Sequence, residues 1–220
     1  MKIDMCFLID CTGSMEEWIQ AAKDQAHYTV NKTQHNTPET EVRVAFVGYR
    51  DYGDSPQFIC RDFGDVNVTM HKIRDVHATG GDDIAEDVAG GLMNVRTLAW
   101  EDDAVKSVIH IADAPPHGMN FHEPWISDRF PQGDPEGKNP LTTLQSLSED
   151  GIDYTFIKIN DSTNTMIREF HSVYTGPGQF QVMDLRPQVS GGVYDFTPAV
   201  FRSLTNSITR HISSQDPSGV

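Results

Sequence analysis

Three oxygen-bearing side chains stand at alternate positions just after the first apolar segment of the chain. The stretch FLIDCTGSM ends its apolar run on Asp10 and continues with hydroxyl residues at Thr12 and Ser14. Alternate side chains of an extended segment point the same way, so these groups can face one ion. Carboxylate and hydroxyl oxygens are hard ligands that suit Mg²⁺, Ca²⁺ or Mn²⁺ and disfavour zinc or copper. The spacing therefore predicts a site for one divalent cation.

A second apolar run of the chain also stops on an acid. The stretch VIHIAD ends at Asp113, in a context that matches the end of the first run at Asp10. Ligands of a doubly wound sheet bind beyond the carboxyl ends of the strands, near the point where the strand order reverses. If the two runs form neighbouring strands, their carboxylates meet at this edge, where they repel each other unless one takes up a proton. A bound cation removes this conflict.

The stretch TGGDDIAED places four acids close together after two glycines. We expect Asp82 or Asp83 to begin a helix there, with Glu86 and Asp87 in its first turns. Such a start also has a local explanation, because Asp83-Ile-Ala-Glu86 has capping-box spacing, as has the segment that begins at Ser14. A metal site is favoured over two helix caps because three separate segments deliver oxygens to one edge of a sheet.

Strand and helix patterns alternate along the chain, which indicates parallel strands joined by right-handed crossovers. We therefore expect an α/β fold with a doubly wound, mainly parallel central sheet of about six strands flanked by helices, as in Rossmann-like proteins. The segment Gln57–Phe63 is expected to be an antiparallel neighbour of the strand before it. A last helix is expected to begin at Thr197 and to bury Phe201, Leu204, Ile208 and Ile212.

Composition limits the possible partners and settings. The 220 residues suit one domain, which we place at 1–213, followed by a flexible tail at 214–220. The net charge of −15 disfavours nucleic acid and anionic membrane surfaces as partners. No apolar run approaches the ~20 residues of a membrane span. The three cysteines do not suggest a disulfide framework, so we expect a reducing, cytoplasmic setting.

The longest irregular stretch, Ala114–Lys138, begins directly after Asp113. A loop of this length within a compact domain is typically functional or disordered, so we expect it to form part of a binding face. Trp125 is the best candidate for contact with a partner, and His117 and His122 are further candidates that can titrate or add a ligand to the site. The alternative is that the aromatic residues of the loop only cover the edge of the sheet.

The same loop allows a different hypothesis, a second metal site that performs hydrolysis. His117, His122, Asp128 and Asp134 carry suitable ligand atoms. However, two histidines five residues apart in a loop have no helical register to aim them at one ion. Solvent-facing or turn-stabilising roles are therefore the simpler interpretation.

The motifs at the two strand ends resemble those of a known family. FLIDCTGSM is similar to the first loop of the von Willebrand factor A domain, which reads Asp-x-Ser/Thr-x-Ser and builds a metal-ion-dependent adhesion site. HIADAPPHG resembles the later strand of that fold, which ends on a metal-site aspartate. Taken together, the stretches DCTGSM, GGDDIAEDV and IADAPPHG most resemble the A domains associated with atypical alpha-kinases.

This resemblance implies a set of ligands and a mode of binding. Asp10, Thr12, Ser14 and Asp113 would hold the ion, completed by Asp82 or Asp83 in place of the threonine of many A domains. The expected ion is Mg²⁺, with Ca²⁺ or Mn²⁺ as alternatives. It would leave one coordination position to water or to an acidic residue of a partner protein. The resemblance therefore implies a protein-binding module without catalysis.

An enzyme that uses Asp10 is the main alternative. Phosphoryl-transfer sites also place an aspartate at the end of a first strand beside Mg²⁺. Phosphatase-like sites, however, need a second acid two residues later, where Thr12 stands, and Lys158 is only a weak candidate for the basic residue of a receiver-like site. There is also no phosphate-binding loop of the Gly-Lys-Ser/Thr kind. We therefore predict a module that is not an enzyme.

Overall fold

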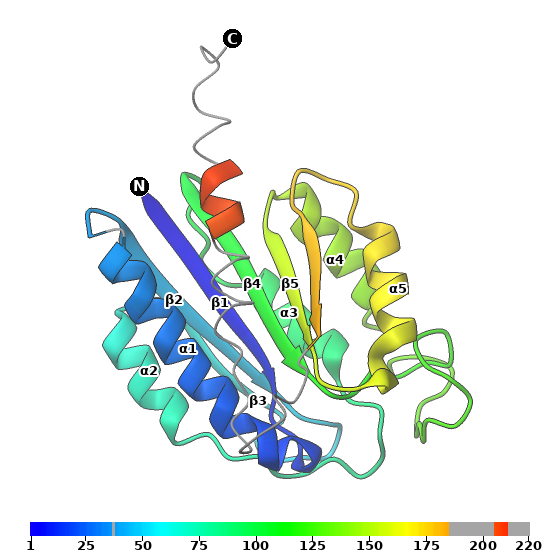
Figure 1. The fold of residues 1–220 in the computed structure, drawn as a ribbon. Coiled ribbons are helices and arrows are strands. Elements are labelled where there is room, and N and C mark those ends of the chain that lie inside the picture. The colour runs from blue at the N-terminus through cyan, green and yellow to red at the C-terminus, as the bar shows by residue number, and fades with distance from the viewer. Residues whose placement is uncertain (37, 185–204, 211–220) are drawn as a thin grey trace.

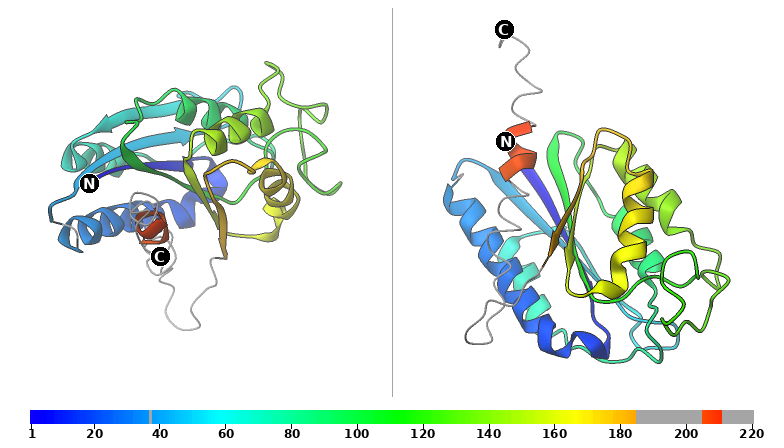
Figure 2. Two further views of the ribbon diagram at one scale, coloured as in Figure 1. Left: turned by 90° about the horizontal axis from the view of Figure 1, so that it is seen from above. Right: turned by 45° about the vertical axis from the view of Figure 1, so that its right-hand side comes forward.

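A six-stranded sheet forms the centre of the molecule, with helices on both faces (Figure 1, Figure 2). The computed structural model describes residues 1–36, 38–184 and 205–210. The strand order is β3-β2-β1-β4-β5-β6, and every neighbouring pair is parallel except β2 and β3. The strands are β1 (Lys2–Asp10), β2 (Glu41–Tyr49), β3 (Phe58–Gly64), β4 (Ala104–Ala112), β5 (Asp153–Lys158) and β6 (Phe180–Asp184). The predicted doubly wound fold and the antiparallel neighbour are both confirmed.

Two groups of helices bury the two faces of the sheet. On one face, α1 (Glu16–Asn36) and α2 (Val66–Arg74) pack on alternate β1 residues such as Met5 and Phe7. The other face, which includes Cys6 and Leu8, is covered by α3 (Val88–Arg96), α4 (Pro140–Glu149) and α5 (Asn164–Val173). Because β1 is buried on both faces, its residues 5–9 form a continuous apolar run and not an alternating pattern.

Helix α3 begins later than the sequence predicts, so the expectation that Asp82 or Asp83 starts it is wrong. Its cap is Asp87, whose Oδ1 accepts a hydrogen bond from the Gly90 backbone N–H at 2.7 Å. The preceding residues are held by the long loop instead, since Ile84 and Ala85 both donate to the Ser127 carbonyl. These tertiary bonds hold the segment before Asp87 in a non-helical conformation, and Ile84 is exposed.

Other predicted helix boundaries have different outcomes. Helix α4 has the predicted cap, because the Asn139 side chain accepts from the Leu141 N–H and Pro140 occupies the first turn. Ser14 is not a cap: it lies in a 3-10 turn, η1 (Gly13–Met15), directly before α1. Residues 205–210 are helical, and Ile208 packs against the core as expected. Thr197, Phe201, Leu204, Ile212 and the tail 214–220 lie outside the described residues, so the boundary at 213 stays a prediction.

None of the helices in the described part of the chain has the length and apolar character needed to cross a bilayer.

Candidate metal site

The first loop joins the acids at the ends of β1 and β4 through two hydroxyl groups. Asp10 is fully buried, and its Oδ1 accepts from the Thr12 N–H at 2.9 Å and from the Thr12 hydroxyl at 2.6 Å. The Thr12 and Ser14 hydroxyl oxygens are 3.3 Å apart, and Ser14 donates to Asp113 Oδ1 at 2.9 Å. The structure thus brings four of the predicted ligands together. They meet because β1 and β4 are parallel neighbours that end at the same edge.

Glu86 is a further acid at this site, and the sequence analysis did not select it. Its side chain is buried beside Thr12, because a methyl group added at Gly81 would lie 2.7 Å from Glu86 Oε1 and 3.3 Å from Thr12 Cβ. Gly81 has a φ of 82°, a conformation that favours glycine. The Gly80 carbonyl accepts from the Gly13 N–H at 2.9 Å, which holds this segment against the first loop. In the sequence, only the two glycines before the acids indicated a close approach to the first loop. The helix expected there made the acids look like helix-start residues, so Glu86 was not selected as a ligand.

The site carries more negative charge than its own side chains can balance. Burial and the neighbouring Asp113 raise the pKa of Asp10 to about 7. Burial and the charge of Asp10 raise the pKa of Glu86 well above its ordinary value. Asp10 Oδ2 and Glu86 Oε2 are both buried without a hydrogen-bond partner. Unpartnered carboxylate oxygens beside two hydroxyl groups fit the oxygen-rich ligand set of Mg²⁺, Ca²⁺ or Mn²⁺.

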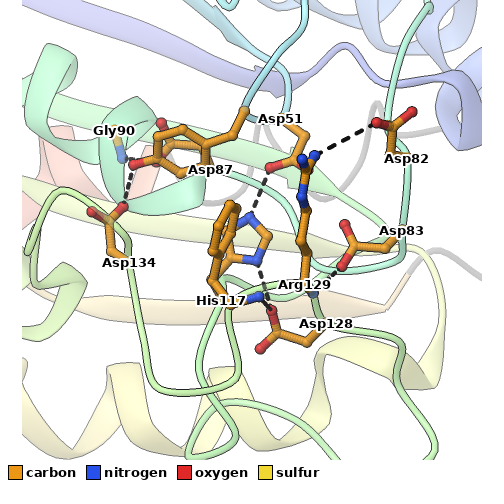
Figure 3. A network of polar contacts seen from close by, with 12 residues as sticks. Asp51, Asp82, Asp83, Asp87, Gly90, His117, Asp128, Arg129 and Asp134 are labelled. Atoms are coloured by element: carbon orange, nitrogen blue, oxygen red, sulfur yellow. Dashed lines mark hydrogen bonds and ion pairs between the residues drawn. The ribbon is translucent and has the colours of Figure 1, made fainter.

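Asp82 and Asp83 lie outside this group of oxygens. The Asp82 side chain is 83% exposed and pairs with Arg129 at 3.7 Å (Figure 3). Asp83 Oδ2 accepts a hydrogen bond from the Arg129 backbone N–H, which belongs to the long loop. Glu86 therefore occupies the place beside Thr12 that the resemblance implied for Asp82 or Asp83.

The two histidines of the long loop are buried within it. His117 lies between two carboxylates, with Nε2 2.7 Å from Asp51 Oδ1 and Nδ1 2.8 Å from Asp128 Oδ1 (Figure 3). His122 Nε2 is 2.9 Å from the other oxygen of Asp128. Burial alone lowers the pKa of His117, but the bonds to Asp51 and Asp128 outweigh it and raise that pKa above its ordinary value. Both rings are buried. Asp134 lies apart from them and accepts a hydrogen bond from the Tyr52 hydroxyl.

The aromatic residues of the loop divide between packing and exposure. Phe121 is buried with Phe170 in the core, and Phe130 packs edge-on against Tyr52. Trp125, in contrast, is 64% exposed. It borders a depression of about 330 Å³ whose wall includes Ser14, Glu86 and Asp113. Of the three predicted partner-binding residues, only Trp125 therefore lies on the surface, and it lies beside the candidate site.

Solved structures with the same fold include a pilus adhesin and a VWA domain. The pilus adhesin SpaC from Lactobacillus rhamnosus GG, in an open conformation, has a TM-score of 0.62 at 15% identity over 97% of this chain and 30% of its own. The VWA domain of SpRpn10 has a TM-score of 0.56 at 13% identity over 85% of this chain and 90% of its own. At these identities the likeness concerns the fold alone.

Curated relatives share more sequence. The alpha-protein kinase vwkA of Dictyostelium discoideum is 32% identical over 172 residues, which are 76% of this chain and 27% of that protein. The von Willebrand factor A domain-containing protein 7 of Mus musculus is 29% identical over 196 residues, which are 88% of this chain and 19% of that protein. The chain therefore spans only a small part of the length of these relatives.

A family model described as the von Willebrand factor A domain matches residues 4–126, which are more than half of the chain. The matched region includes the first loop, Glu86, Asp113 and Trp125. The chain belongs to the von Willebrand factor A domain family.

Proposed function

We propose that the chain is a protein-interaction module that depends on a divalent cation at the edge of its sheet. Asp10, Thr12, Ser14, Glu86 and Asp113 would hold the ion. Mg²⁺ suits this oxygen-only set, and Ca²⁺ or Mn²⁺ are alternatives. The observation that supports the proposal most is the pair of buried, unpartnered oxygens on Asp10 and Glu86. Buried acceptors are otherwise satisfied in nearly all cases, so a cation is the simplest partner for both.

The residues around the ion have distinct roles in this mechanism. The backbone and hydroxyl of Thr12 orient Asp10, and the Ser14 hydroxyl orients Asp113. When bound, the cation supplies an open coordination position that the carboxylate of a partner can take. The depression beside Ser14 and Asp113 gives such a group access, and Trp125 at its border offers an aromatic contact.

Catalysis by Asp10 is the less suitable interpretation. A phosphoryl acceptor must reach its substrate, and Asp10 is fully buried with one oxygen committed to Thr12. Lys158, the basic candidate, pairs with Asp161 at 2.5 Å. Both observations favour the binding module over a phosphoryl-transfer enzyme.

Capture of a protein partner in Mg²⁺ and in EDTA tests the proposal. We expect wild type to retain a partner in Mg²⁺ and to release it in EDTA, and Asp113→Ala to fail to retain it under both conditions. Asp82→Ala is the matched control, because it removes the same charge from an exposed position. Retention of the partner by Asp113→Ala, or equal retention in EDTA, would contradict the proposal.

Trp125→Ala separates partner contact from packing. Because Trp125 is 64% exposed, we expect the melting temperature to change little. Partner affinity should fall by roughly 1–3 kcal/mol, as for an aromatic contact at the centre of an interface. The comparison variant is Phe121→Ala, whose buried ring should cost roughly 3 kcal/mol of unfolding free energy. A destabilised Trp125→Ala protein that binds its partner normally would assign this residue to packing.

A further inference from the structure

A second group of metal-ligating side chains lies under the long loop, apart from the site at Asp10. One ligand atom each from Asp83, His117 and Asp128 lies within 4.8 Å of the others. The three residues come from two segments distant in sequence, and Figure 3 shows their side chains converging. This group contains the imidazole nitrogen that the Asp10 site lacks, so its chemistry is different.

Two carboxylate oxygens at this cluster have no partner. Asp51 Oδ2 and Asp83 Oδ1 are buried and accept no hydrogen bond. The Asp51 side chain is only 1% exposed, and its other oxygen contacts His117 Nε2. Leaving a buried acceptor unsatisfied is costly, so the Asp83 oxygen, which belongs to the group of ligand atoms, favours a cation at this cluster.

The proton count at His117 supports the same conclusion. Both of its nitrogens face carboxylates, and an ionised carboxylate cannot donate a hydrogen bond. Each nitrogen must therefore carry a proton or a metal ion. A divalent ion in place of the Nδ1 proton would bind between this nitrogen and the Asp128 carboxylate, while the Nε2 proton stays with Asp51.

The contact between His117 and Asp51 is the arrangement found around metal-binding histidines. Such a histidine donates its second N–H to a carboxylate, which fixes the tautomer and the orientation of the ring. Here Asp51 Oδ1 accepts a hydrogen bond from the Nε2–H of His117 at 2.7 Å. The other ring nitrogen, Nδ1, is then directed towards Asp128. Asp128 is itself held by the Gly118 and Phe130 backbone N–H groups at 2.7 Å each.

We propose that Asp83, His117 and Asp128 bind a second divalent cation, of the zinc class, with Asp51 as the residue that orients His117. A ligand set of one imidazole and two carboxylates suits Zn²⁺ better than Mg²⁺. The role is structural, because the ion joins the segment before α3 to the long loop. It thereby holds the loop that carries Trp125 and supports the face used for partner binding.

The test uses ZnCl₂ alone as the probe on the full chain, with Mg²⁺ in excess and a chromophoric chelator as competitor. We expect wild type and Asp10→Ala to bind stoichiometric Zn²⁺ with equal affinity. Asp83→Asn and His117→Gln should each bind at least about tenfold more weakly. Co²⁺ gives a second readout, because its visible spectrum should change on binding to wild type and not to His117→Gln.

Several outcomes would overturn the second site. They are Zn²⁺ affinity unchanged in Asp83→Asn, loss of Zn²⁺ binding in Asp10→Ala, or no Zn²⁺ binding by wild type. Each would leave His117 as the centre of a hydrogen-bonded network without a metal. Asp83 is only partly buried, so Asp83→Asn is expected to fold even if His117→Gln does not. Mg²⁺ binding at Asp10 is measured on the same samples, so failure of the first site is distinguishable from failure of the second.

Discussion

Replacing Asp10 with alanine is expected to reduce Mg²⁺ affinity by about 100-fold or more. Even residues that only orient metal ligands contribute 10–100-fold, and Asp10 is placed here as a ligand. The variant removes one of the two unpartnered oxygens and releases Thr12 from its two bonds to the carboxylate. Titration calorimetry with Mg²⁺, Mn²⁺ and Ca²⁺ measures the effect.

The matched control for this variant is Asp82→Ala. It removes a charge from the same edge of the molecule, but the Asp82 side chain is 83% exposed and pairs with Arg129 at 3.7 Å. We expect Asp82→Ala to bind Mg²⁺ as wild type does. If both variants lost the same amount of Mg²⁺ affinity, the ion would be attracted by the net negative charge of this edge and not held by Asp10 as a ligand. This result would contradict the proposed site.

Replacing Glu86 with glutamine is expected to have two opposite effects. It should weaken Mg²⁺ binding, yet raise the melting temperature of the metal-free protein at pH 8. The second effect follows from burial, which raises the pKa of Glu86 well above its unfolded value near 4.5. As the pH rises above that unfolded value, the unfolded chain releases this proton and the folded chain keeps it, so the free energy of unfolding falls.

Glutamine cannot ionise, so the variant loses this pH-dependent destabilisation. We expect a gain of roughly 2 kcal/mol at pH 8 and little difference at pH 4, below the unfolded pKa. Thermal unfolding at both pH values, in EDTA and in Mg²⁺, measures both effects. A glutamine variant that is less stable than wild type in EDTA at pH 8 would show that Glu86 is satisfied by the protein itself.

The sequence was sufficient for the fold and for the acids at the strand ends. Apolar runs that stop on Asp10 and Asp113 belong to strands buried on both faces, and parallel strands deliver their ends to one edge. These properties are local and periodic, so they can be predicted without tertiary information. The same holds for the start of α4 at Asn139 and Pro140, where cap and first turn are adjacent in sequence.

The parts that could not be predicted depend on contacts between loops. Glu86 reaches Thr12 because its segment is held by the long loop, and its own N–H donates to the Pro115 carbonyl at 3.0 Å. Capping-box spacing at Asp83 suggested a helix, but those tertiary bonds outweighed the local preference. The position of His117 between Asp51 and Asp128 likewise joins residues 66 and 11 positions away, which no local pattern records.

Asp113 has two structural roles, because it contributes a site carboxylate and is also the first residue after β4, where the long loop begins. Its carbonyl also accepts a hydrogen bond from the Ser162 hydroxyl, which ties this point to the segment before α5. A partner that binds the proposed face and pulls on Trp125 would therefore pull on a chain segment that begins at Asp113, a proposed ligand of the ion. Thermodynamic reciprocity then requires that the bound partner raise the affinity for the ion by the same factor as the bound ion raises the affinity for the partner. Tension on the bound complex would accordingly be transmitted to the coordination sphere, so that the lifetime of the attachment under load would depend on how slowly the ion exchanges.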